Sequence, residues 1–148
     1  MIDPDKVPAV DDDEIVARFV ITGASAKSLK NLVRANKTVK PQLFIPYPHR
    51  DVSVNRHRDC DETETWAFGA GIAQVRQKTL HGRSDISVES CSLDPLSVIA
   101  KPIKDDPEGV PDNPNHADII GFPALKADQK SFALKLAAAA GDCQSPPS

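Results

Sequence analysis

The chain has 148 residues, of which 40% are hydrophobic and 26% charged, and its formal net charge is -3. This size and composition are typical of one soluble globular domain. The negative charge excludes a nucleic-acid binder with a uniformly basic surface, because neutralising phosphates requires clustered Lys and Arg. The charge is uneven, since residues 1–14 contain six acids and one lysine and leave the remainder slightly basic.

The three cysteines, Cys60, Cys91 and Cys143, are widely spaced and form no C-x-x-C motif. This excludes a zinc ribbon and a complete disulfide framework. No charged-then-apolar start resembles a signal peptide, and no apolar run approaches the ~18 residues that a bilayer span needs. We therefore expect a cytoplasmic protein without membrane contact.

The composition along the chain predicts one folded unit with two polar ends. Residues 1–13 are acidic and polar, which predicts a flexible leader, and residues 142–148 predict a flexible tail. The domain between them covers residues 14–141.

The first half of the domain predicts two strands. The β-branched run 15–21 predicts a first strand, and residues 24–40 predict a loop or a weak single helix. Residues 43–45 lie between two prolines, which favours an extended segment. Residues 51–56 alternate, so we expect a half-buried strand with Val52 and Val54 inward and the nearby arginines on the other face.

The second half predicts two helices and three strands. Asp61 and Glu64 have the spacing of a capping box, which predicts the start of a helix. Residues 85–89 and 96–100 predict two strands joined as an antiparallel hairpin, and residues 117–121 predict a last strand. A final helix is expected to start at Asp128 and end at Gly141. The element order indicates an α+β fold: one domain, a mostly antiparallel sheet and two covering helices.

The segment 49–58 concentrates three arginines and two histidines in an otherwise acidic protein. Arg50, Arg56 and Arg58 are separated by even intervals, so they project from one face if the strand continues that far. Guanidinium groups bind phosphate or carboxylate in a bidentate way, which makes this face a candidate anion site. The alternative is that the arginines pair with nearby carboxylates such as Asp59 and Glu62.

The four histidines, His49, His57, His81 and His116, show no local metal-binding spacing, so we expect no metal and no cofactor. The turns containing His81, Arg83, Asn115 and His116 are expected to accompany the arginine segment as ligand-binding residues. His49, His57 and His116 are the candidates for acid–base catalysis. The alternative is that each histidine is solvated or holds a structural hydrogen bond.

Four segments of the sequence carry a resemblance. The runs 51–57, 80–85 and 113–123, together with Trp66, resemble a family of small bacterial proteins with no assigned activity. The similarity extends from about residue 40 to 141. This resemblance implies a bacterial cytoplasmic protein whose polar motif residues lie on loops around one sheet.

Two functional hypotheses remain open from the sequence. The first is a non-enzymatic accessory or interaction module that binds a partner protein or an anionic ligand through its Arg/His-rich face. The alternative is a phosphoryl- or glycosyl-transfer enzyme that acts on a nucleotide or nucleic acid with the candidate histidines and arginines.

Overall fold

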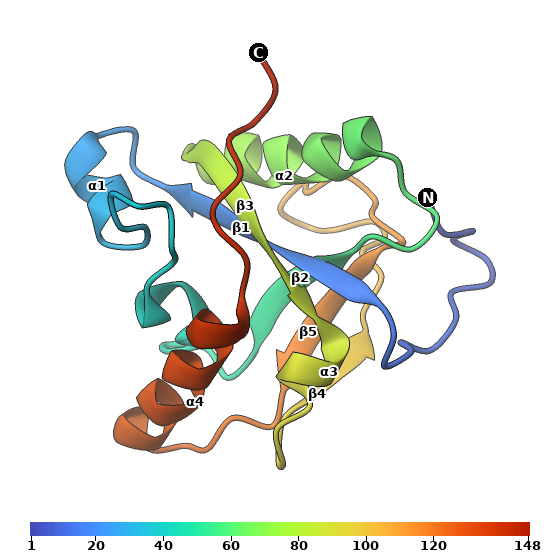
Figure 1. The fold of residues 1–148 in the computed structure, drawn as a ribbon. Coiled ribbons are helices and arrows are strands. Elements are labelled where there is room, and N and C mark those ends of the chain that lie inside the picture. The colour runs from blue at the N-terminus through green and yellow to red at the C-terminus, as the bar shows by residue number, and fades with distance from the viewer.

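A five-stranded antiparallel sheet in the order β3-β1-β2-β5-β4 forms the centre of the computed structural model, which describes residues 1–148 (Figure 1). This confirms the predicted α+β fold. The elements, in chain order, are β1 (Ile15–Thr22), α1 (Ala26–Lys30), the 3-10 helix η1 (Pro41–Phe44), β2 (Val52–Arg56), α2 (Glu62–Arg76), β3 (Thr79–Ser87), α3 (Val88–Cys91), β4 (Ser97–Ala100), β5 (His116–Ile120) and α4 (Lys126–Ala139).

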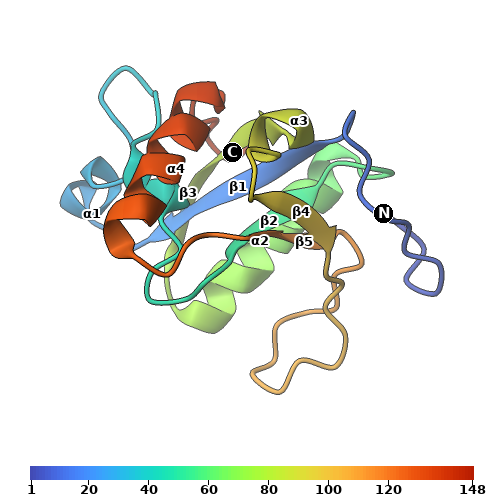
Figure 2. The ribbon, with the colours of Figure 1, turned by 90° about the horizontal axis from the view of Figure 1, so that it is seen from below.

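The two long helices cover opposite faces of the sheet, with α4 on one side and α2 on the other (Figure 2). The main core lies on the α4 side, because alternate strand residues send their apolar side chains there. Its buried members include Val16, Val52 and Ile119 from the strands and Ala133 and Leu136 from α4. The segment between β4 and β5 extends from the sheet on the same side as α2 (Figure 2).

Helix α2 starts as predicted, at a capping box. The Asp61 carboxylate accepts a hydrogen bond from the Glu64 backbone N–H at 2.7 Å, and the Glu64 side chain accepts one from the Asp61 N–H at 3.3 Å. Gly69 then allows the helix to approach β1 closely, since a Cβ at this position would lie 2.7 Å from the Phe19 ring. The sequence therefore determines both the start of α2 and its distance from the sheet.

The predicted hairpin between residues 85–89 and 96–100 is wrong. Strand β3 ends at Ser87, whose hydroxyl accepts a hydrogen bond from the Ser90 N–H and so caps the short helix α3. Helix α3 buries Val88 and Cys91 and carries the chain across the sheet. Strand β4 consequently pairs with β5 and lies at the opposite edge from β3.

Two helix predictions also need correction. Residues 41–44 form η1, although an extended segment was expected around 43–45, because Pro41 is compatible with a first helical position and Leu43 and Phe44 are buried by the turn. Helix α4 starts at Lys126 without a side-chain cap, and Asp128 lies within its first turn.

Parts of both chain ends contact the domain. Ile2 is only 1% exposed, and its N–H donates to the Asn115 side-chain oxygen at 2.9 Å. Near the other end, Gln144 exchanges two backbone hydrogen bonds with Arg83 of β3. Residues in the predicted leader and tail therefore take part in the packing.

No helix of this fold combines the length and the apolar character that crossing a membrane requires.

Candidate functional site

Arg56 lies in the interior of the protein, and its predicted position on the face opposite the valines is wrong. A strand alternates with period two, so Arg56 shares its face with Val52 and Val54. Its side chain is 0% exposed and is neutralised by Glu14, with N–O distances of 2.8 Å from both Nε and Nη2. The guanidinium also donates to the Pro8 and Ala9 carbonyls. All three of its nitrogens are occupied within the protein.

The other two arginines of the 49–58 segment also have internal partners. Arg58 pairs with Asp11 at 3.2 Å and with Glu14 at 3.7 Å, and Arg50 donates to the Phe122 carbonyl at 2.9 Å. The alternative that carboxylates neutralise the arginines is therefore correct for Arg56 and Arg58, but the acids are Asp11 of the leader and Glu14, the first residue of the domain.

Arg83 belongs to a separate polar cluster beside the N-terminal end of α2. Its guanidinium forms two hydrogen bonds of 2.9 Å with Glu62 and lies 4.9 Å from the centre of the Trp66 ring. His57 contacts Asp85 in the same cluster, at 2.9 Å. Burial raises the pKa of Asp85, but the hydrogen bond and charge of His57 and the Arg83 charge outweigh this and lower it.

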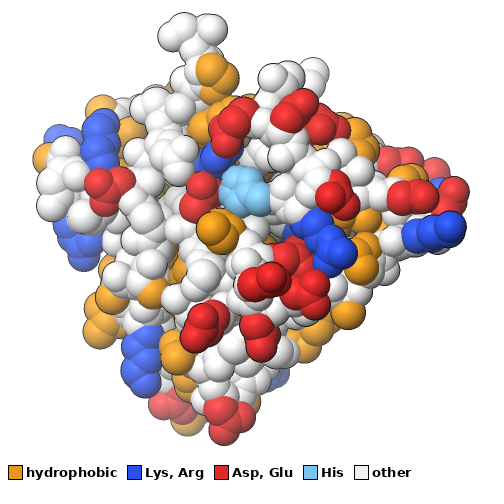
Figure 3. Space-filling view, turned by 45° about the vertical axis from the view of Figure 1, so that its right-hand side comes forward, with side chains coloured by type: hydrophobic (Ala, Val, Ile, Leu, Met, Phe, Trp, Pro, Cys, Tyr) orange, Lys and Arg blue, Asp and Glu red, His pale blue; other side chains and the backbone are white.

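The face formed by the leader, the start of α2 and α3 is dominated by acidic side chains, with few cations among them (Figure 3). The arginines of this region thus pair with carboxylates of residues 11–14 and of α2. An anionic ligand would meet repulsion here.

The histidines are distributed over different parts of the fold. His81 Nε2 contacts the Gly23 carbonyl at 2.8 Å, whereas His49 is exposed. His116 at the start of β5 contacts the Lys101 carbonyl through Nδ1, at 2.8 Å. Asn115 is buried and donates to the carbonyls of Arg56 and Arg58. Among the candidate site residues, His116 lines two adjoining cavities beside the sheet.

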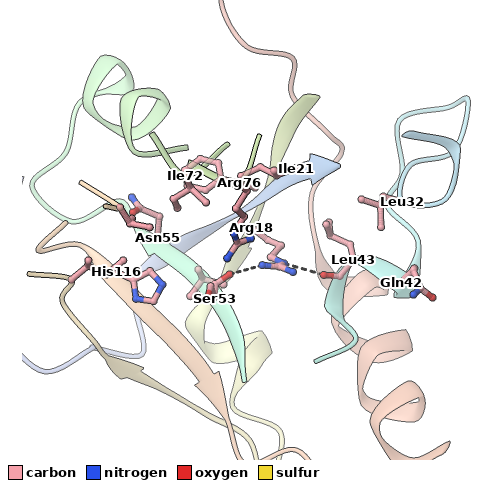
Figure 4. Close-up of a pocket in the computed structure, with 14 residues that line it drawn as sticks. Arg18, Ile21, Leu32, Gln42, Leu43, Ser53, Asn55, Ile72, Arg76 and His116 are labelled. Carbon is pink, nitrogen blue, oxygen red and sulfur yellow. Dashed lines mark hydrogen bonds between the residues drawn. The ribbon is translucent and has the colours of Figure 1, made fainter. Parts of the chain in front are cut away.

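That cavity lies between the sheet, α2 and the segment that connects β4 with β5, and its volume is about 130 Å³ (Figure 4). Eight of its lining residues are hydrophobic. The others are polar and belong to β1, η1, β2, α2 and β5. The lining residues are Arg18, Phe19, Ile21, Leu32, Gln42, Leu43, Ser53, Val54, Asn55, Ile72, Arg76, Ile103, Val110 and His116.

The cavity exists because β1 and β2 separate. The two strands pair only at Val16 with Arg56 and at Ala17 with Asn55. Arg18, the next residue of β1, spans the gap by donating from Nε to the Leu43 carbonyl and from Nη1 to the Ser53 carbonyl, each at 2.9 Å. Its Nη2 makes no hydrogen bond.

A second arginine faces Arg18 across this cavity. Arg76, in the last turn of α2, directs its guanidinium toward that of Arg18 (Figure 4). Neither arginine belongs to an ion pair with a carboxylate. Burial, and then the positive charge of Arg76, lower the pKa of Arg18 to about 10. Two cations without an ion-paired carboxylate therefore meet at a cavity that combines apolar and polar side chains.

A hydrogen-bond network fixes the wall opposite α2. The Asn113 side chain donates to the Asn55 side-chain oxygen at 2.8 Å, and both residues are buried. A single bridge pairs Ile103 with Asn113 at the base of the connecting segment. The bridge holds Ile103 at the cavity, which Val110 of the same segment also lines. His116, the first residue of β5, completes this wall.

A second cavity of about 290 Å³ adjoins the first and shares Ser53, Ile103 and His116 with it. The charged side chains that line the second cavity are Lys101, Lys104, Asp106 and Asp118. The two cavities form one candidate site, with a cationic apolar part under α2 and a mixed-charge part under the β4–β5 segment.

Sequence reasoning missed Arg18 and Arg76. Arg76 gave no distinctive signal, because a cation in the last turn of a helix also complements the helix dipole. Arg18 did carry a signal, because it is the only charged residue in the apolar run 15–21. Long charged side chains are rarely enclosed unless they are paired or functional.

The structure contains no group of three or more His, Cys, Asp or Glu side chains arranged to hold a metal ion. No protein family, curated protein sequence or solved structure matches the chain. The residues and geometry of the site therefore carry its interpretation, and the resemblance to small bacterial proteins stays a prediction.

Proposed function

We propose that this protein binds a small organic anion with an apolar group in the cavity under α2. One observation carries the proposal: Arg18 and Arg76 converge there without a counter-ion. Arg18 is partly buried, and withdrawing a charge from water is costly unless an opposite charge compensates it, while the exposed Arg76 adds a second positive charge beside it. A ligand carboxylate or phosphate would supply that charge through hydrogen bonds to guanidinium groups, which are among the stronger ones in proteins.

The size and lining of the cavity support a ligand with a compact apolar part. Its volume of about 130 Å³ is close to that of the ~150 Å³ apolar cavity that holds benzene in an engineered protein. Phe19, Ile72 and Val110 supply apolar walls from three different segments. A phenyl or short branched aliphatic group attached to the anion fits this description.

This proposal refines the ligand-binding form of the first hypothesis and moves its site from the 49–58 arginines to Arg18 and Arg76. A partner protein stays a proposal, and so does a cytoplasmic location, which three cysteines without disulfides support. The enzymatic alternative has less support, because of the three candidate catalytic histidines only His116 lines the cavity.

Calorimetric titration with 3-phenylpropanoate and with phenyl phosphate tests the proposal. We expect at least one of them to bind, and the uncharged 3-phenylpropanol to bind at least tenfold more weakly, since hydrogen bonds to charged groups contribute about 1.5–3 kcal/mol. Arg76→Gln removes one cation from an exposed position and should weaken binding by about tenfold. Lys78→Gln, the same charge change just beyond α2, is the matched control and should leave binding unchanged.

Two results would refute the proposal. One is the absence of measurable binding for both anions. The other is an equal effect of Arg76→Gln and Lys78→Gln, because this would mean that only the overall charge matters.

A further inference from the structure

Asp118 of β5 is a nearly buried carboxylate that lacks a hydrogen-bond donor. Its side chain is 7% exposed, and its contacts are charge pairs of 3.4 Å to Lys101 Nζ and 3.8 Å to His116 Nε2. No hydrogen bond within the protein reaches either carboxylate oxygen, and neither oxygen is fully enclosed, so both can accept from a ligand. The unused acceptor capacity faces the second cavity, which Asp118 lines.

The position of Asp118 connects it with the arginine pair. Strands β2 and β5 place Asp118 directly opposite Ser53, whose carbonyl accepts the hydrogen bond from Arg18. The negative charge of Asp118 is close enough to act on Arg18. Ser53 and His116 line both cavities, so the two cavities meet at these residues. A ligand bound at the arginines can therefore extend past Ser53 and His116 to Asp118.

We propose that the ligand is a zwitterion, namely an α-amino acid with an apolar side chain, and this inference rests on the proposed function. Its carboxylate binds Arg18 and Arg76, its ammonium group donates to Asp118, and its side chain occupies the apolar part of the cavity. Charges of both signs on the ligand thus match charges of both signs in the site.

The groups already near Asp118 allow an ammonium to enter. Lys101 is 60% exposed, and exposed ion pairs contribute little, so its ammonium can move aside into solvent. Lys104 lines the same cavity from an exposed position, and Asp106 adds a second carboxylate. His116 directs Nδ1 to the Lys101 carbonyl, so in the neutral ring that nitrogen carries the hydrogen and Nε2 carries none.

Calorimetry with three related probes tests this inference. L-phenylalanine carries both charges, 3-phenylpropanoate only the carboxylate, and phenethylamine only the ammonium. We expect L-phenylalanine to bind about tenfold more tightly than 3-phenylpropanoate, because it gains one charged hydrogen bond, and phenethylamine to bind more weakly than both. Asp118→Asn should remove the preference for L-phenylalanine and keep 3-phenylpropanoate binding, whereas Asp142→Asn, at an exposed tail position, should change neither.

The outcomes separate this inference from the proposed function. If the wild-type protein binds 3-phenylpropanoate and L-phenylalanine equally, or if Asp118→Asn keeps the preference, the zwitterion is excluded while the anion site stands. If neither 3-phenylpropanoate nor phenyl phosphate nor L-phenylalanine binds, both fail. Retained 3-phenylpropanoate binding shows that the Asp118→Asn variant is folded.

Discussion

Glu14→Gln is expected to destabilise the protein strongly, because it removes the charge that neutralises Arg56. Arg56 is 0% exposed, Glu14 is 8% exposed, and two N–O contacts of 2.8 Å join them. Breaking a buried pair by removing one partner costs about 3–5 kcal/mol, since the other charge stays buried without compensation. This is a large fraction of the ~5–15 kcal/mol that stabilises a typical domain.

Urea unfolding monitored through the single tryptophan, Trp66, measures this loss. Asp11→Asn is the matched control: it breaks a contact with Arg58 whose two side chains are 35% and 66% exposed, so its cost should stay below about 1 kcal/mol. The double variant Glu14→Gln with Arg56→Met should recover part of the stability, because it leaves no buried charge unpaired. A cost of Glu14→Gln below about 1 kcal/mol would refute this account of the Glu14–Arg56 pair.

Three further predictions follow from packing and charge. Gly69→Ala should destabilise by about 1–3 kcal/mol in urea unfolding, because its Cβ would meet the Phe19 ring at 2.7 Å. Burial raises the pKa of Glu14, but hydrogen bonds, the strongest from Arg56, outweigh this and lower it. Stability from Glu14 is therefore present above the unfolded-state pKa and lost as pH falls below about 5, and this acid-induced loss should shrink in Glu14→Gln. Ile72→Glu places a carboxylate four residues before Arg76 at the cavity and should weaken 3-phenylpropanoate binding at least tenfold more than Ile72→Gln does; equal effects would contradict a role for charge.

Local signals in the sequence predicted the elements whose causes are local. The capping box at Asp61 and Glu64 determined where α2 begins, and the β-branched run 15–21 determined β1. The hairpin prediction failed because tertiary packing, and not local sequence, determines which strand β4 pairs with. Nothing in residues 96–100 distinguishes a partner 85–89 from a partner 116–120, whereas the cap at Ser87 and the burial of Val88 decide it in the folded chain.

The candidate site was harder to predict because it depends on the separation of strands β1 and β2. Arg18 borders a cavity only because β1 and β2 stop pairing after Ala17, and strand separation leaves no mark in one sequence. His116 was identified because histidine is itself a chemical signal. Asp118 was not among the candidate site residues, and its low exposure without a hydrogen-bond donor became visible only in the packing.

Arg18 and Arg56 show how similar sequence positions acquire different roles. Each lies within a strand at the same parity as flanking valines, so each is directed away from bulk solvent. Arg56 meets Glu14 and two carbonyls, which compensate its charge and make it a structural anchor for residues 8–14. Arg18 meets two carbonyls and a second arginine, so its charge is hydrogen-bonded but not neutralised. The chain provides an ion-paired carboxylate for Arg56 and none for Arg18, and this difference makes the Arg18 cavity the stronger candidate for ligand binding.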